Sequence, residues 1–298
     1  MKDNQTPQKT PETPDNTARI AALRRRYDDA KTRRQNWQGL WQDAYDFAMP
    51  QRGDFTNTPR QSGAQKGERV FDATALDAVD QLAASLLGNL TPPWSQWFGF
   101  KPGPDLSAAE AEGLKPVLED VAAKLQDHLE RSNFAVEIHQ SFLDLVVGGT
   151  ASLYVEEAEP GALAAFNFTA LPLSDIVLQE GVGGDLDTTF RESRLRLDEL
   201  QSRFPGATLP QSLLAEGERD AEAQFTVVEA VVPDETAFVY SAYLKDYSDE
   251  QAMLSQMRLP ASPFISFRWM KSPGEIYGRS PVMKSLPDIK TANKVVEL

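Results

Sequence analysis

The sequence predicts an α+β protein in which an N-terminal helical region precedes a mainly antiparallel sheet and a final helix. In the first half of the chain, apolar residues recur at steps of three and four, which is typical of helices with one buried face. Further along, alternating patterns rich in β-branched and aromatic residues are typical of strands. The last twenty or so residues return to helical spacing.

The chain begins with a polar, proline-rich tail. Residues 1–16 contain too little apolar surface to bury, so we expect them to be disordered. A single long helix is then predicted from Thr17 to Ala48, and Pro50 ends it. Arg34 interrupts the apolar face of this helix once. The residues that form the face are Ile20, Leu23, Tyr27, Ala30, Trp37, Trp41, Ala44 and Ala48. Residues 51–68 are a Gly-rich and Gln-rich loop with several basic side chains.

The stretch from Arg69 to Phe100 combines a helix with a cluster of aromatic rings. Asp72 is the expected N-cap, and Pro92-Pro93 cannot continue the helix. The apolar positions are Leu76, Val79, Leu82, Ala83, Leu86, Leu87 and Leu90, a face wide enough that we expect burial on more than one side. Four large rings then follow within seven residues: Trp94, Trp97, Phe98 and Phe100.

We interpret this stretch as an assembly element that packs inside its own subunit and toward a neighbouring one. If Trp97 lies in a core, its replacement by Ala costs about 3–5 kcal/mol.

Two further helices are predicted before the strands begin. Ser107 and Glu110 have the spacing of a capping box. We expect Pro116 to split the helix that follows, leaving Leu118, Val121, Leu125 and Leu129 on one face. Another helix is predicted from Val136 to Val147, ending at Gly148-Gly149.

Seven segments then have strand character: SLYVEE, AAFNFTA, DIVLQE, TTFRESRLRL, FTVVEAVV, TAFVYSAYLK and FISFRWM. Turns are expected at Pro160-Gly161 and at Gly181–Gly184, and a short helix near Asp198–Phe204. The final helical segment reaches Leu298 with no glycine or proline to end it. We therefore expect a longer parent polypeptide, with a natural helical C-terminus as the alternative.

Composition excludes several classes of function. The chain has 30 Lys and Arg against 44 Asp and Glu, a net charge of −14, which argues against a protein whose main role is to grip nucleic acid. It has no cysteine, which excludes disulfides, thiolate metal sites and cysteine nucleophiles. Its first residues lack the apolar core of a signal peptide, and no run approaches the roughly 20 apolar residues that span a bilayer.

No catalytic, cofactor-binding or metal-binding residue is predicted. His128 and His139 lack the spacing of a helical zinc pair, and the glycines at 181–184 lack the lysine of a phosphate loop. Glu156-Glu157 and Asp28-Asp29 can in principle coordinate a cation, but adjacent residues on a regular element point in different directions, so a solvated face is favoured. An acidic cytoplasmic metal-dependent hydrolase that uses paired carboxylates stays open as an alternative.

The segment 19–34 reverses the charge of the chain locally. It contains seven basic residues, namely Arg19, Arg24, Arg25, Arg26, Lys31, Arg33 and Arg34. A solvent-exposed helix face is the favoured interpretation. A salt-bridge role between subunits, or a scaffold or adaptor that binds a partner or a phosphate backbone here, is the alternative.

Four strings of residues, in order, resemble the head-to-tail connecting (portal) proteins of short-tailed bacteriophages. The first is RRQNWQGLWQDAYDFAMPQRGDF, and the second is RVFDATALDAVDQLAASLLGNLTPPWSQWF. The third is FLDLVVGGTASLYVEE, and the fourth is SPFISFRWMKSPGEIYGRSPVMKSLPDIKTANK. The first, second and fourth are specific as ordered strings. The resemblance covers about four-fifths of the chain; the polar tail lies outside it, and residues 198–224 contribute little.

The resemblance implies a structural protein of the virion, assembled in the host cytoplasm, with no catalytic residues and no cofactor. Proteins of this kind form a dodecameric ring at one capsid vertex. A separate terminase drives DNA through the ring without sequence specificity, and capsid, scaffold and tail proteins contact it. No membrane is involved.

By the same resemblance, residues 17–277 form the wing-like region and residues 278–298 begin a helix toward the stem. Family members continue past the position equivalent to Leu298, through a clip and a returning stem helix.

Overall fold

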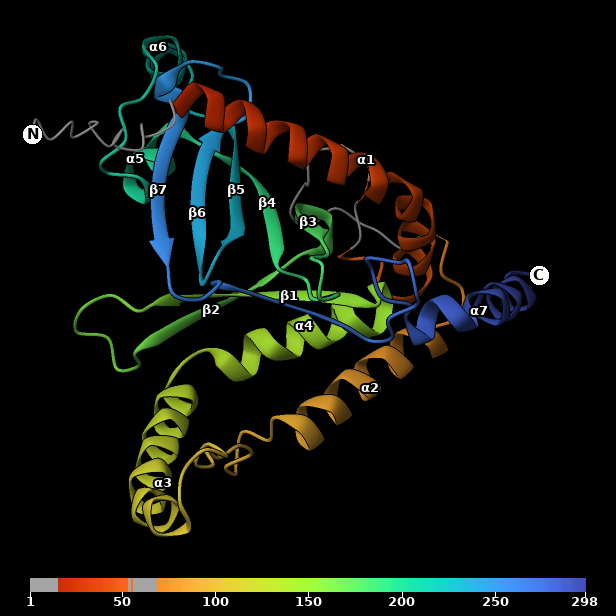
Figure 1. Cartoon of the computed structure of the whole chain (residues 1–298). Helices are drawn as coiled ribbons and strands as arrows, with labels where there is room; N and C mark the ends of the chain where they lie inside the picture. Colours follow the sequence, from red (N-terminus) through yellow and green to blue (C-terminus); the bar gives the residue numbers. More distant parts are fainter. Residues whose placement is uncertain (1–15, 53–54, 56–68) are drawn as a thin grey trace, which may run out of the picture. The chain divides into compact units, whose positions relative to one another are not determined.

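The computed structural model describes residues 16–52, 55 and 69–298, and it contains two compact units (Figure 1). The first unit holds residues up to Thr32 together with Phe190–Pro260, and the second holds Arg33–Thr189 and Ala261–Leu298. The expected α+β order, with helices first, antiparallel strands next and a helix last, is confirmed. Residues 1–15, for which we predict disorder, lie outside the described residues. So does most of the predicted loop at 51–68.

Helix α1 (Asn16–Ala48) confirms the predicted long helix and begins within the segment expected to be disordered. Its apolar face is buried as the spacing predicts, apart from Trp37, which is half-buried. Arg34 does not interrupt that face, which corrects the sequence-based expectation: its side chain is 3% exposed. The guanidinium donates to the backbone carbonyls of Leu173 and Ser174 at 2.9 and 2.8 Å, which allows a charged residue to occupy a core position.

In the second unit, α4 (Phe134–Gly148) is buried throughout its second half, and it lies against β1 and β2 (Figure 1). Helix α2 (Thr74–Leu90) packs along α4. Only Val79 and Ala83 of α2 are buried, so the expected burial on more than one side is wrong for the single chain. Asp72 is not the N-cap, because Ala73 occupies that position, but the Asp72 carboxylate accepts a bond from the Thr74 amide at 3.0 Å.

Helix α3 (Ala108–Arg131) begins with the predicted capping box between Ser107 and Glu110. The expected split at Pro116 is wrong, since the helix runs through it. Pro116 removes one hydrogen bond to the carbonyl of Glu112, and both residues are exposed, so water can satisfy that carbonyl. The helix therefore tolerates the proline.

The second unit also contains a three-stranded antiparallel sheet in the order β2-β1-β8. Its strands are β1 (Thr150–Glu157), β2 (Phe166–Leu171) and β8 (Phe264–Arg268). Leu153 at the centre of β1 faces Ala170 on one side and Ile265 on the other. A short helix (Leu173–Asp175), strand β3 (Ile176–Gln179) and the final helix α7 (Pro281–Glu297) complete this unit.

The first unit is built on strands β4 (Thr188–Leu195), β5 (Phe225–Asp234), β6 (Ala237–Leu244) and β7 (Met253–Leu259), which are neighbours in that order. The predicted strands thus form two sheets. Helix α5 (Leu197–Arg203) confirms the predicted short helix. Helix α6 (Gln211–Arg219) and strand β7 were not predicted. In the described part of the chain, no helix is both long and apolar enough to cross a membrane.

Candidate assembly surface and the core that supports it

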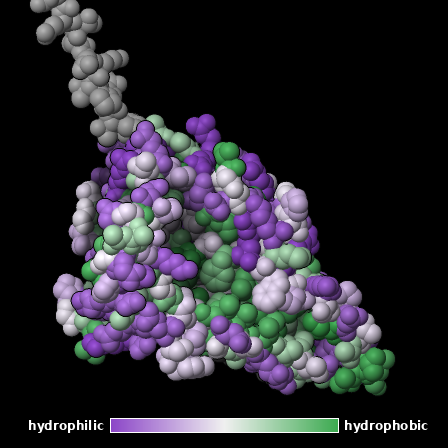
Figure 2. Space-filling model, turned by 60° about the horizontal axis from the view of Figure 1, so that its bottom comes forward, coloured by the Kyte–Doolittle hydropathy of each residue, from purple (hydrophilic) through white to green (hydrophobic). Residues whose placement is uncertain are grey.

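Large apolar side chains are exposed along one continuous part of the second unit, from the start of α2 to the start of α4. Trp94 is 75% exposed and Trp97 is 37% exposed. The other exposed apolar residues in this part are Phe71, Leu90, Phe100, Leu106, Leu114, Val117, Val121 and Val136. Figure 2, in which the underside of Figure 1 comes forward, shows hydrophobic residues gathered between hydrophilic areas. Exposed apolar surface of this extent is typical of interaction sites.

The aromatic segment Trp94–Phe100 contacts its own unit through Trp97. Trp97 stacks on Phe134 of α4, with ring centres 5.9 Å apart and planes inclined by 10°. Phe134 in turn contacts Phe168 of β2 edge to face at 5.1 Å. Trp97 therefore holds the segment against α4 while Trp94 remains free to contact another molecule. Trp97, through this stack, and the half-buried Phe98 meet the prediction that the segment packs inside its own unit, and packing toward a neighbour remains a prediction.

Trp41 of α1 lies in the core of the second unit. It is fully buried, and its indole Nε1 donates to the carbonyl of Gly148 at 3.0 Å. Its ring meets Tyr277 edge to face at 4.8 Å and stacks on Trp37 at 5.7 Å. These contacts bring together α1, the end of α4 and Tyr277 of the IYGRSP sequence, which lie far apart in the chain.

Two glycines meet at this point. Gly149, the C-cap of α4, has φ of 74°, a left-handed conformation that favours glycine. A Cβ on Gly149 would lie 2.2 Å from the carbonyl oxygen of Gly278, and a Cβ on Gly278 would lie 2.2 Å from that of Gly149. Neither position has room for a side chain. The close approach places Gly278 so that its amide donates to Thr150 Oγ1 at 2.8 Å.

Ser280 then begins α7. Its hydroxyl donates to the carbonyl of Val147 at 2.8 Å and accepts the amide of Met283 at 2.9 Å, so it caps α7 while contacting the end of α4. The start of the final helix is fixed to the core of the second unit through these bonds.

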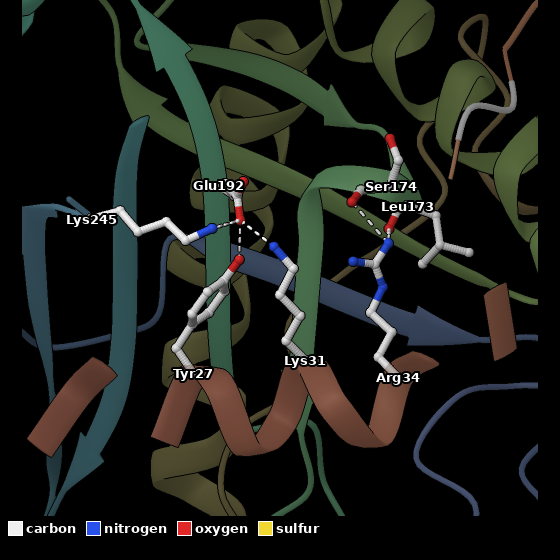
Figure 3. Close-up of polar contacts among 7 residues, drawn as sticks. All are labelled: Tyr27, Lys31, Arg34, Leu173, Ser174, Glu192 and Lys245. Carbon is white, nitrogen blue, oxygen red and sulfur yellow. Dashed lines mark hydrogen bonds and ion pairs between the residues drawn. The ribbon is translucent and has the colours of Figure 1, made fainter. Parts of the chain in front are cut away.

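In the first unit, a half-buried charge cluster joins α1 to the sheet (Figure 3). One oxygen of Glu192 on β4 accepts from Lys31 at 2.7 Å and Lys245 at 3.1 Å, and also from the hydroxyl of Tyr27. Burial alone raises the pKa of Glu192, but the bonds from Lys31 and Tyr27 and the charges of both lysines outweigh it and lower this pKa to about 2. Burial lowers the pKa of Lys31, against the opposing effect of Glu192.

A second carboxylate lies deeper in the same sheet. Glu229 of β5 is fully buried and accepts from Arg203 of α5 at 2.9 Å and from the hydroxyl of Tyr240 at 2.7 Å. Arg191 of β4 lies 3.3 Å from its other oxygen. Since a buried carboxylate is costly without partners, these contacts stabilise Glu229 and fix α5 on the sheet.

The basic residues of segment 19–34 divide between the interior and the surface. Arg24 donates to the carbonyl of Tyr247 at 2.6 Å, and Lys31 and Arg34 make the internal contacts given above. Arg25, Arg26 and Arg33 are exposed. The favoured interpretation, a solvent-exposed face, therefore describes only part of the segment.

The other sequence candidates do not converge. Among the residues that the structure describes, no group of three or more His, Asp or Glu side chains could hold a metal ion. Glu156 accepts from Asn167 at 3.0 Å, and the His128 ring lies edge to face with Phe166 at 6.4 Å. The glycines at 181–184 form the expected turn, in which the Gly184 amide donates to the Gly181 carbonyl at 3.0 Å.

Residues 21–298 match the bacteriophage head to tail connecting protein family. The chain belongs to that family. It is 26% identical over 279 residues to a probable portal protein of Bordetella phage BPP-1, which covers 89% of this chain and 49% of the relative. It is 25% identical over 199 residues to the portal protein of Escherichia phage T7, covering 65% of this chain and 34% of the relative.

This head-to-tail connecting protein chain thus spans about half, or less, of the length of the relatives it matches. Sequence reasoning identified the family but missed the Gly149–Gly278 contact and the Glu192 cluster. Gly149 belongs to the predicted end of a helix and Gly278 to the IYGRSP sequence, but nothing in their spacing indicates that these two glycines are in contact.

Proposed function

We propose that this chain is a structural portal subunit that joins copies of itself in a ring at a capsid vertex, through which DNA is packaged and ejected. The family match over residues 21–298 carries the proposal. Both relatives named above are described as portal proteins or probable portal proteins. In this arrangement residues 17–277 form a wing-like region, and residues 278–298 begin a helix toward the stem.

The exposed aromatic segment supplies the kind of surface that such a ring needs. Subunit interfaces are enriched in Trp, Phe and Met at their centres and depleted in charge. Trp94 has this character and is held in place through Trp97. A ring forms when one patch contacts a different patch on the next copy by a rotation that closes. We therefore assign one side of the ring contact to the aromatic segment.

The acidic net charge of the chain favours a channel through which DNA passes over a protein that binds DNA tightly. With a net charge of −14, the chain as a whole repels the DNA backbone. DNA would pass through such a ring without sequence specificity. The subunit would carry out no chemistry of its own and would need no cofactor; a terminase would supply the work, and capsid, scaffold and tail proteins would be its other partners. Its location would be the virion, after assembly in the host cytoplasm as a dodecamer.

The test is the oligomeric state of the purified chain and of two alanine variants, measured by sedimentation velocity. Trp94→Ala removes an exposed ring from the aromatic segment. Leu163→Ala removes an apolar side chain that is 83% exposed elsewhere in the same unit, and it is the control. We expect oligomers of the unaltered chain and of Leu163→Ala, and a shift toward monomer for Trp94→Ala with an unchanged circular dichroism spectrum. A chain that stays monomeric at every concentration would contradict the proposal.

A further inference from the structure

Asn293 of α7 makes three hydrogen bonds to backbone groups that precede α2. Its Oδ1 accepts the amides of Phe71 at 2.6 Å and Asp72 at 3.1 Å. Its Nδ2 donates to the carbonyl of Arg69 at 2.7 Å. The side chain is polar yet only 6% exposed, and it lies more than 220 positions from its partners. A buried amide with acceptor and donor both satisfied has a defined orientation.

The contact continues into α2. The Asp72 carboxylate, whose own amide is held by Asn293, accepts from the amide of Thr74 at 3.0 Å and from its hydroxyl at 2.7 Å. Thr74 is the first residue of α2. Two successive hydrogen bonds therefore lead from α7 to the first turn of α2, which has no N-cap bond from its own cap residue.

Two ion pairs join α1 to α7 and to the segment before α2. Lys290 of α7 lies 2.8 Å from Asp43, and Arg69 lies 3.6 Å from Asp46. The cations of Lys290 and Arg69 both lie near the ring of Phe47, at 5.4 and 5.3 Å from its centre. Three segments meet here, but among these contacts only Asn293 joins α7 to the backbone before α2 directly.

We infer that Asn293 is a positioning residue that makes α2 follow α7, so that the aromatic segment at the far end of α2 changes position when α7 does. This inference goes beyond the proposed ring and does not depend on it. Within a ring it would connect the subunit contact to the helix that leads toward the stem. Asparagine suits the role because one oxygen serves two amides while its nitrogen serves a carbonyl.

The test compares Asn293→Ala, Asn293→Asp and the control Thr291→Ala, which alters an exposed hydroxyl on the same helix. Because the chain has no cysteine, spin labels can be placed specifically at Ala84→Cys on α2 and Val295→Cys on α7, both exposed. Dipolar spectroscopy then measures the distribution of distances between α2 and α7. Hydrogen exchange measures the protection of the Phe71 and Asp72 amides.

We expect Asn293→Ala to broaden the distance distribution and to speed exchange at Phe71 and Asp72 by about tenfold, the effect of losing one ordinary hydrogen bond. Asn293→Asp keeps both acceptor bonds, so these two amides should stay protected and the distribution should stay narrow. Thr291→Ala should match the unaltered chain.

Unchanged protection and a narrow distribution in Asn293→Ala would overturn the inference. A broad distribution in a folded Asn293→Asp whose two amides remain protected would also overturn it, and this variant decides the question if Asn293→Ala does not fold.

Discussion

The indole Nε1 of Trp41 lies 3.0 Å from the carbonyl oxygen of Gly148, so a side chain of α1 satisfies the last residue of α4. The final carbonyls of a helix have no partner within the helix. Here the partner is a tryptophan that is also packed against Tyr277. One side chain thereby serves both the apolar core and a helix end.

Trp41→Phe should destabilise the second unit. The smaller ring keeps much of the packing but leaves the buried Gly148 carbonyl without its donor, at a cost of about 1–3 kcal/mol. Trp94→Phe is the matched control, since this ring is exposed and its replacement should change stability by less than about 0.5 kcal/mol. Urea denaturation at constant m-value measures both. Equal midpoints for the two variants would show that the indole bond contributes nothing.

Gly278→Ala should be among the most damaging single-methyl changes in the chain. Its Cβ would meet the Gly149 carbonyl oxygen at 2.2 Å, so the backbone must separate, at a cost of several kcal/mol and with loss of the Thr150 bond. Gly39→Ala adds the same methyl inside α1 where nothing lies within 4 Å, and it should stabilise by about 0.5–1 kcal/mol. Thermal denaturation should therefore move in opposite directions. A shared direction would refute the glycine contact.

The Glu192 cluster should give the first unit an acid-sensitive stability. The pKa of Glu192 is about 2 in the folded chain against an ordinary 4.5, so its stabilisation is complete above 4.5 and is lost as the pH falls toward 2. We expect this loss to be about 2 kcal/mol, after allowing for the part of the side chain that solvent reaches. Glu192→Gln should be less stable at neutral pH and should lose less on acidification. The control Glu157→Gln, at an exposed position, should follow the unaltered chain. Parallel curves for Glu192→Gln and the unaltered chain would contradict the role of this carboxylate.

Charge reversal separates the two kinds of arginine in segment 19–34. Arg24→Glu removes the bond to the Tyr247 carbonyl and should cost about 1–3 kcal/mol. The double change Arg25→Glu and Arg26→Glu alters exposed side chains and should change the free energy of unfolding by less than about 0.5 kcal/mol.

Fluorescence anisotropy at several salt concentrations measures the DNA affinity of the same variants. If the double variant lost a strongly salt-dependent affinity for DNA, the exposed arginines would be a nucleic-acid contact after all.

Local patterns predicted the elements whose burial is one-sided and regular. The three-four spacing of α1 was sufficient because nearly every third or fourth residue faces the core. Strand β7 was missed because only Leu254 among its residues is fully buried, so the alternation that reveals a strand is weak. The sequence predicts a break at Arg34 because the acceptors of its guanidinium, Leu173 and Ser174, are about 140 residues away. No local pattern records such a partner.

The contacts of the aromatic segment could also be predicted only in part. Its sequence predicted apolar contacts but could not divide them between the subunit and its neighbours. With Trp97 37% exposed and stacked on Phe134, its replacement by Ala should cost about 1–2 kcal/mol, less than the loss expected for a core ring. Trp94 contributes little to the single chain, and its importance would appear only on assembly.

Electron microscopy of the purified chain, combined with native mass spectrometry, tests the central claim most directly. The account predicts particles in which subunits repeat by rotation around a central opening, with one dominant stoichiometry that Trp94→Ala disrupts. A compact monomer at every concentration, unchanged by Trp94→Ala, would contradict it.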